Sequence, residues 1–177
     1  MSLTFRELWT STHGMIFGAV FLLAFAGGLA GLYSLRPAYV TAAGLKERVW
    51  RLKWGTGVMA LIAWLTVISG SYIVYPWYRA TPPEGTADLS AFPRSFLKAD
   101  PSIAGWHSFG MEWKEHVAWF APILATVVFY IVVKYGPQLA DDDRLRRMTL
   151  VLFILAFAAA GIAGLLGALI TKAAPVM

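Results

Sequence analysis

The sequence predicts an all-α integral membrane protein whose four transmembrane helices form an up-down bundle. Hydrophobic residues make up 58% of the 177 residues and charged residues only 14%, whereas soluble domains carry about 25% charged residues. Four apolar runs approach the ~20 residues that a helix needs to cross the ~30 Å hydrocarbon core of a lipid bilayer. We therefore expect residues 1–177 to form a single membrane domain.

The first span is expected at about residues 13–35 and the second at about residues 55–75. The first span ends at Arg36 and Pro37. It carries two GxxxG pairs that allow a neighbouring helix to approach closely: Gly14/Gly18 and Gly27/Gly31. The second span closes on the aromatic sequence YPWYR, in which Pro76 is the expected stop.

A proline-rich extracytoplasmic loop is expected at residues 76–115, between the second and third spans. Five prolines prevent one regular helix over its first part: Pro76, Pro82, Pro83, Pro93 and Pro101. Residues 89–99 leave room for a short interfacial turn. No proline lies between residues 102 and 121, so the helix of the third span can begin outside the hydrocarbon.

The third span is expected at about residues 116–135, with a kink at Pro122, and the fourth at about residues 148–170. Gly136 and Pro137 interrupt the helical pattern between them. Three aspartates then precede three arginines at the start of the fourth span. This order suits a helix start, because the N-terminal end of the helix dipole favours acidic side chains.

Basic residues in the connections predict the orientation, because short connections rich in Lys and Arg stay in the cytoplasm. The connections between spans one and two and between spans three and four carry nine: Arg36, Lys46, Arg48, Arg51, Lys53, Lys134, Arg144, Arg146 and Arg147. The opposite side carries six: Arg6, Arg79, Arg94, Lys98, Lys114 and Lys172. Both termini are therefore expected on the periplasmic side of a bacterial inner membrane.

Composition excludes several kinds of chemistry. The chain has no cysteine, which rules out disulfides, iron–sulfur clusters and covalent attachment of a c-type haem. The spans hold no acidic residues, whereas a proton relay needs ionisable groups at mid-membrane. The net charge of +5 comes from residues beside the apolar spans, so we expect no nucleic-acid partner.

Residues 105–120 hold two of the three histidines beside the entry of the third span, and ionisable groups at such a position indicate a functional site. Spans one and three run in the same direction, so His13 and His116 are expected at one depth. Two histidines at one depth on separate helices meet the requirement for axial ligation of a haem iron. On span one, the face that includes Gly27 is small and leaves room for a flat macrocycle. The sequence thus predicts one haem b held by His13 and His116.

Alternatives for these residues remain open. His107 is a rival ligand, but it lies nine residues before His116 and points the opposite way on a continuous helix, unless the helix breaks at Gly110. Each histidine can instead be an amphipathic anchor at the headgroups. A non-haem metal at Glu112, Glu115 and His116 is a weaker alternative, because paired Glu-x-x-His motifs are missing.

Arg79 lies just outside span two, on the side of the histidines. Its guanidinium could pair with a haem propionate or hydrogen-bond a quinone carbonyl, although an interfacial anchor flanked by Trp77 and Tyr78 is the simpler interpretation. Glu112 and Lys114 are expected to be solvated charges in the headgroup region.

The function predicted from these residues is that of a b-type cytochrome subunit in an electron-transfer complex, rather than a stand-alone enzyme. It would exchange electrons with a quinone or a c-type cytochrome. The alternative is a cofactor-free accessory subunit of a larger respiratory or photosynthetic complex, or one that ligates a chlorophyll. The architecture is similar to small four-helix cytochrome b membrane anchors in general. Those anchors carry histidines within their spans, and here none lies mid-span, so no second haem is expected.

Overall fold

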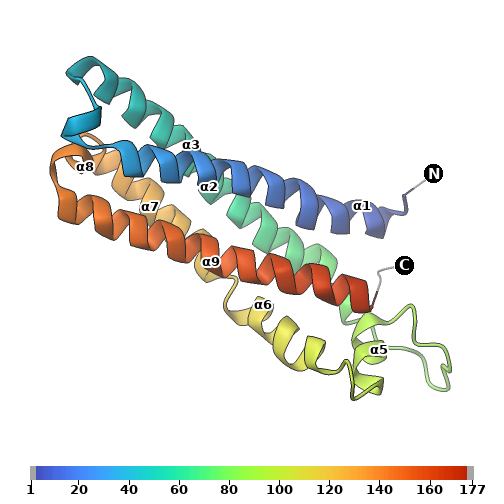
Figure 1. Ribbon diagram of the computed structural model, residues 1–177. Helices are drawn as coiled ribbons and strands as arrows, with labels where there is room; N and C mark the ends of the chain where they lie inside the picture. Colours follow the sequence, from blue (N-terminus) through green and yellow to red (C-terminus); the bar gives the residue numbers. More distant parts are fainter. Residues whose placement is uncertain (1–2, 175–177) are drawn as a thin grey trace. The chain divides into compact units, whose positions relative to one another are not determined.

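The computed structural model describes residues 3–174, and within that range it contains helices and turns but no strand. Four helical stretches of 30 to 37 residues are long and apolar enough to cross a membrane: Phe5–Ser34, Ala42–Tyr78, Trp106–Tyr135 and Asp143–Ala173 (Figure 1). This confirms the prediction of an integral membrane protein with four transmembrane helices.

Each stretch is built from shorter elements. The first comprises α1 (Phe5–Ser11), a π-helical turn η1 (Thr12–Ile16) and α2 (Phe17–Ser34). The second comprises α3 (Ala42–Ser69), the π-helical turn η3 (Gly70–Val74) and α4 (Tyr75–Tyr78). The third comprises the π-helical turn η4 (Trp106–Met111), α6 (Glu112–His116) and α7 (Phe120–Tyr135). The fourth is α9 (Asp143–Ala173). Between them lie a 3-10 turn η2 (Pro37–Tyr39) and the short helices α5 (Pro93–Ala99) and α8 (Gln138–Asp141).

The third stretch begins ten residues before the predicted boundary at residue 116, because the helix starts outside the apolar run. Asp100 stabilises the turn that precedes this helix. Its carboxylate accepts hydrogen bonds from the Ser102 hydroxyl at 2.7 Å and from the Ser102 backbone N–H at 2.8 Å. These hydrogen bonds lower the pKa of the Asp100 carboxyl. The helix is then interrupted by turns at residues 117–119, immediately before Pro122, which lies in the first turn of α7, where the missing N–H is tolerated.

The second stretch continues beyond its predicted stop at Pro76. The π-helical turn η3 directly precedes this proline, and Tyr75 donates its N–H to the carbonyl of Gly70. A widened turn gives the proline ring space that a regular α-helical turn does not. The helix therefore includes Pro76 and ends at Tyr78.

Two compact units emerge from the tertiary contacts. Unit 1 takes the described residues up to Gly18, residues 65–119 and the described residues from Gly161 on; unit 2 takes residues 19–64 and 120–160. Unit 1 therefore contains all three histidines. Unit 2 contains one long apolar segment between His13 and His107 and a second one after His116.

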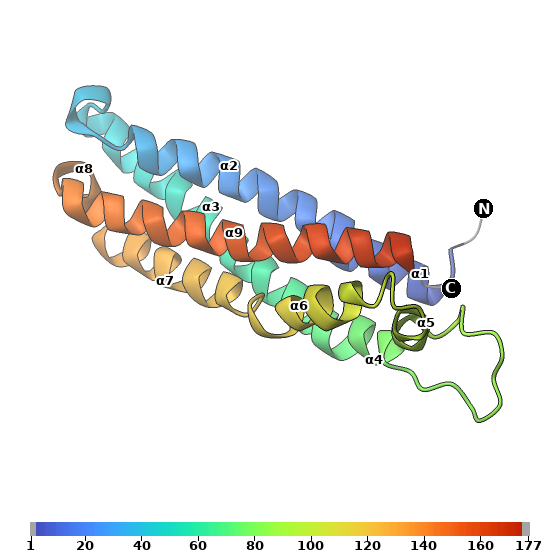
Figure 2. The ribbon, with the colours of Figure 1, turned by 60° about the horizontal axis from the view of Figure 1, so that its bottom comes forward.

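Unit 2 is a bundle in which segments of α2, α3, α7 and α9 run side by side and successive helices alternate in direction (Figure 2). Aromatic stacking is prominent in it: the Phe25 ring lies 4.0 Å from that of Phe157 and 5.1 Å from that of Phe153, centroid to centroid. Gly28 lies under Phe153 and Gly57 under Phe129, at positions where a Cβ would crowd the ring. These glycines let the helices approach closely. Of the predicted GxxxG glycines only Gly31 makes such a contact, with Leu52, whereas Gly14, Gly18 and Gly27 have nothing within 4 Å of a Cβ position.

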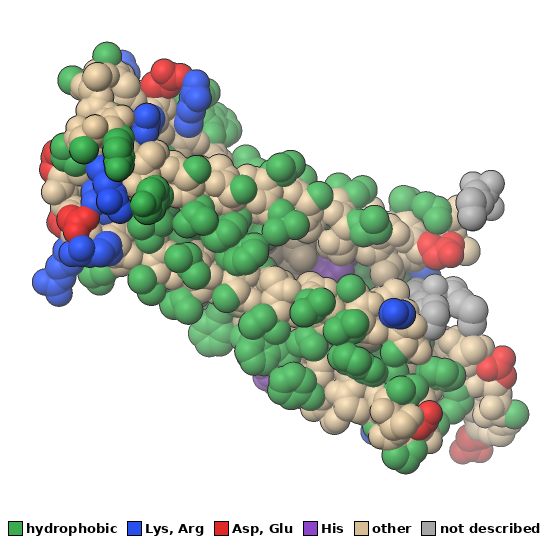
Figure 3. Space-filling view, in the orientation of Figure 1, with side chains coloured by type: hydrophobic (Ala, Val, Ile, Leu, Met, Phe, Trp, Pro, Cys, Tyr) green, Lys and Arg blue, Asp and Glu red, His purple; other side chains and the backbone are tan. Residues whose placement is uncertain are grey.

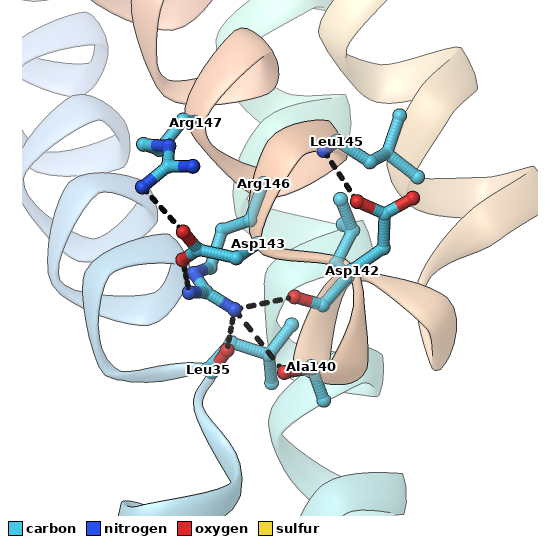
Figure 4. Close-up of polar contacts among 8 residues, drawn as sticks. Leu35, Ala140, Asp142, Asp143, Leu145, Arg146 and Arg147 are labelled. Atoms are coloured by element: carbon cyan, nitrogen blue, oxygen red, sulfur yellow. Dashed lines mark hydrogen bonds and ion pairs between the residues drawn. The ribbon is translucent and has the colours of Figure 1, made fainter.

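One end of unit 2 collects Lys and Arg side chains, around the α2–α3 and α7–α9 connections (Figure 3). Arg146 is the exception among them, because it is buried, with 4% of its surface exposed. Its guanidinium donates to the carbonyls of Leu35, Leu139 and Ala140 at 3.0–3.1 Å and pairs with Asp143 (Figure 4). Arg146 thus ties the ends of α2 and α8 to the start of α9.

Unit 1 has a smaller core, in which the C-terminal part of α9 packs against α4, α5 and η4. Its buried members are Tyr78, Leu97, Met111, Ile170 and Ala174. Gly110 in η4 lies close to Ile170 and Leu166, where a Cβ would be only 3.3 Å from the nearest Ile170 atom. This close approach brings α6 against α9.

Candidate histidine site in unit 1

His13 lies in the π-helical turn η1 and packs against the second long helix. Its Nδ1 is 3.1 Å from the hydroxyl of Ser69, a side chain that is 5% exposed. The imidazole lies over Gly70, so closely that a Cβ there would come within 2.7 Å of the His13 Cε1. Glycine at position 70 therefore makes room for the His13 ring.

The hydrogen bonds of Ser69 favour one tautomer of His13. The Ser69 hydroxyl donates to the carbonyl of Thr66 at 3.1 Å, and this uses its only proton. With its proton placed there, the same oxygen accepts from His13 Nδ1–H, which leaves the lone pair on Nε2. This is the tautomer that a metal-ligating histidine needs, with Nδ1–H held by a neighbouring acceptor.

His116 is held in the same tautomer by its own helix. Its Nδ1 is 2.8 Å from the backbone carbonyl of Glu112, one turn earlier in α6, and 3.7 Å from the Glu112 carboxylate. Both groups accept hydrogen bonds, so Nδ1 is again the protonated nitrogen. The side chain is 73% exposed, which leaves Nε2 open to a group that approaches from outside the helix.

His107 differs from the other two histidines. Its Nδ1 is 2.9 Å from the hydroxyl of Tyr78, a residue that is 5% exposed. A tyrosine hydroxyl can donate or accept, so this contact does not assign the proton to either nitrogen. The preference for His13 and His116 over His107 thus has a physical basis, although the ligand prediction stays untested.

Three π-helical turns coincide with this region. His13 lies in η1, His107 lies in η4, and η3 begins at Gly70, next to the serine that binds His13. All three turns belong to unit 1. Fewer than about 1% of residues in globular proteins are π-helical, and such turns are frequent at functional sites. Their position at the histidines indicates that the helices are locally distorted to aim these side chains.

The remaining predicted site residues are less directly connected. The Arg79 guanidinium donates to the hydroxyl of Tyr75 at 3.0 Å and lies over the Tyr75 ring, as expected of an interfacial anchor. Gly27 belongs to unit 2, is exposed, and has nothing within 4 Å of where a Cβ would stand. The neighbouring Gly28 makes the close helix contact instead.

The structure does not gather the predicted ligands into a preformed cluster. His13 contacts Ser69 and Gly70, His107 contacts Tyr78, and His116 contacts Glu112. Across residues 3–174, no three histidine or acidic side chains stand close enough together to hold a metal ion. The donor set nevertheless fits a haem iron chemically, since imidazole nitrogens are haem ligands and the Nδ1 contacts of His13 and His116 leave Nε2 as the ligating atom.

Lys114 is not the solvated charge that the sequence predicts. Its side chain is instead partly buried, and its Nζ lies against the backbone of Gly167 in α9, in the position that a Cβ would occupy. The spacing in the sequence could have indicated this contact. Lys114 lies one helical turn after Gly110, and Gly110 packs against Ile170 of α9, so both residues lie on the face that contacts α9.

Comparison of the chain with protein-family models, with curated proteins and with solved structures gave no match. Functional inference therefore rests on the geometry of unit 1.

Proposed function

We propose that this protein is a membrane subunit of an electron-transfer complex and that it binds one haem b through Nε2 of His13 and His116. The observation that carries the proposal is the shared oxygen contact at Nδ1. In both imidazoles this contact favours the tautomer with Nδ1–H, which leaves Nε2 as the ligating atom, and such a contact fixes the orientation and raises the basicity of a ligating histidine.

Haem would supply one-electron redox chemistry, and its potential depends on the axial ligands and their hydrogen bonds. The chain's own contribution is positioning. Ser69 and Gly70 fix the plane of the His13 ring, and the α6 backbone fixes that of His116. Because His116 is exposed, its ligand position is reached from outside α6. The exchange partners we propose are a quinone and a c-type cytochrome, with other membrane subunits alongside.

Orientation is part of the proposal. The excess of basic residues in the α2–α3 and α7–α9 connections supports a cytoplasmic position for them in a bacterial inner membrane. Both termini, the α5 connection and the histidines then lie on the periplasmic side. Arg79, beside Tyr75, would be available there to a haem propionate or a quinone carbonyl.

The test is haem content in single histidine variants of the full chain. His13→Ala and His116→Ala should each reduce haem from about one per chain to near zero, because removing one axial ligand exposes the iron and weakens its retention. His107→Ala is the matched control and should keep the haem. The measurements are a reduced-minus-oxidised absorption spectrum and a pyridine haemochrome assay on detergent-solubilised protein, with membrane insertion checked in parallel. Full haem in both alanine variants would show that this ligand pair is wrong.

A cofactor-free accessory subunit is the second candidate, and one observation favours it: every histidine already has a hydrogen-bond partner within the chain. A colourless protein, purified together with its native partners so that cofactor loss is excluded, would support this alternative. A chlorophyll-like spectrum would instead indicate a pigment-binding assembly.

A further inference from the structure

Lys114 carries a charged side chain that packs against a neighbouring helix. The side chain crosses from α6 to α9, and both Nζ and Cε lie against Gly167. His13 is close enough to interact with it electrostatically. Among residues 3–174, no acceptor makes a hydrogen bond or ion pair with the Lys114 ammonium. An unpaired charge that packs against a neighbouring helix at the entry to a membrane span is costly, and such residues usually serve a ligand or a pathway.

The carboxylates nearest in sequence are engaged elsewhere. Glu112 lies beside the His116 imidazole, and Glu115 lies close to the Tyr75 hydroxyl. Three other polar groups of unit 1 are buried without a hydrogen-bond partner within the described chain: the Trp113 indole nitrogen, the Arg94 Nε and the Thr10 hydroxyl. Buried polar groups without partners call for a missing ligand, ion or water.

We propose that Lys114, next to His13, forms a binding site for an anionic oxygen ligand, a carboxylate or a phosphate. Gly167 is what makes the site possible, because any side chain there would occupy the position of the ammonium. A charge-assisted hydrogen bond from the ammonium satisfies such an oxygen, and the apolar surroundings strengthen the attraction.

Two sources can supply this chemistry. One is a propionate of the proposed haem, and this version rests on the proposed function, since His13 is one of its iron ligands. The other is the phosphate of an anionic membrane lipid, which needs no haem. The Lys114 ammonium would bind an anionic oxygen in the same way in both cases. The experiment therefore has one arm for each source of the anion and uses the same Lys114 variants in both arms.

The lipid arm uses native mass spectrometry of the full chain in a neutral detergent. Wild-type protein should retain phosphatidylglycerol about tenfold more tightly than diacylglycerol, which lacks the phosphate, as expected for one charge-assisted hydrogen bond. Lys114→Met, which keeps the length and removes the charge, should lose that preference. Lys172→Met removes an exposed lysine of α9 and should keep it.

The haem arm compares haem b with its dimethyl ester, in which both propionates are neutral, by titration into haem-depleted protein. If a propionate occupies the site, wild-type protein should bind haem b roughly tenfold more tightly than the ester, and Lys114→Met should bind both alike. Equal binding in wild-type protein together with no lipid preference overturns the anion site but leaves histidine ligation intact. Failure of both haem forms with a Lys114-dependent lipid preference refutes the haem proposal and supports the anion site.

Misfolding is distinguished by thermal unfolding without lipid or haem. Replacing this unpaired, partly buried cation with an apolar side chain of similar length should leave the midpoint unchanged or raise it. Lys114→Gln, which retains a donor without the charge, is the second variant. If either variant retains the wild-type preference in whichever arm shows one, Lys114 does not hold the anion.

Discussion

At the scale of single residues, Arg146 is the side chain on which unit 2 most depends. It is 4% exposed, and one guanidinium nitrogen donates to three backbone carbonyls at the ends of α2 and α8. Arg146→Met should lower the free energy of unfolding by about 2–4 kcal/mol, because buried carbonyls lose their donors and Asp143 loses a partner. Thermal unfolding in detergent measures this directly.

The matched control for Arg146 is its neighbour Arg147. It pairs with the same aspartate, but its side chain is 71% exposed. Arg147→Met should change stability by no more than about 0.5 kcal/mol, as is usual for exposed ion pairs. Equal effects of the two substitutions would mean that the buried carbonyl contacts contribute nothing beyond the ion pair.

At the scale of helical elements, the close approach of η1 and η3 depends on Gly70. An alanine Cβ would stand 2.7 Å from the His13 Cε1, so Gly70→Ala should push the imidazole away from Ser69. Overpacking of this kind costs about 1–3 kcal/mol, and we expect haem retention to fall with it. Gly14→Ala is the control on the other helix, since nothing lies within 4 Å of its Cβ position.

The paired readout for Gly70 is haem content and thermal unfolding of the same preparations. Gly14→Ala should retain haem and match or slightly exceed wild-type stability, because alanine favours the helix. If Gly70→Ala retains both haem and stability, the His13 ring does not lie over Gly70 as described.

Helical elements also show how far the sequence could predict this fold. Hydropathy alone identified four spans, because a run of about 20 apolar residues has few other uses. Hydropathy does not detect η4 and α6, which lie before the apolar run of α7. The proline-free stretch from residue 102 predicted a helix there, but its exact start depends on Asp100 and Ser102. Hydropathy also missed the π-helical turns, because one widened turn hardly changes the hydrophobic period.

The candidate site was predictable in part for the same reason. His13 and His116 stood out as rare ionisable residues at span starts, but their tautomers depend on Ser69, Thr66 and the α6 backbone. These are tertiary or local contacts that no spacing rule gives. Lys114 was misjudged because its environment is set by Gly167, 53 positions later in the chain.

At the scale of the whole molecule, exposed apolar side chains and charges divide the surface in the way that a bilayer requires. Large apolar side chains on the long helices are strongly exposed, among them Met15, Leu23, Leu61 and Leu165, at 61–75%. Exposure on this scale is unfavourable in water and favourable against lipid. An even number of spans places both termini on one side, which leaves the choice of side to the basic residues.

The orientation can be tested cleanly because the chain has no cysteine of its own. Ala87, in the α4–α5 connection, and Ala43, in the first turn of α3, are both exposed alanines. In intact cells with a permeabilised outer membrane, a membrane-impermeant maleimide should label Ala87→Cys. It should label Ala43→Cys only after the inner membrane is opened, because the basic α2–α3 connection is retained in the cytoplasm. The reverse pattern would place the histidines on the cytoplasmic side, and exchange with a periplasmic c-type cytochrome would then be excluded, although haem binding itself would not.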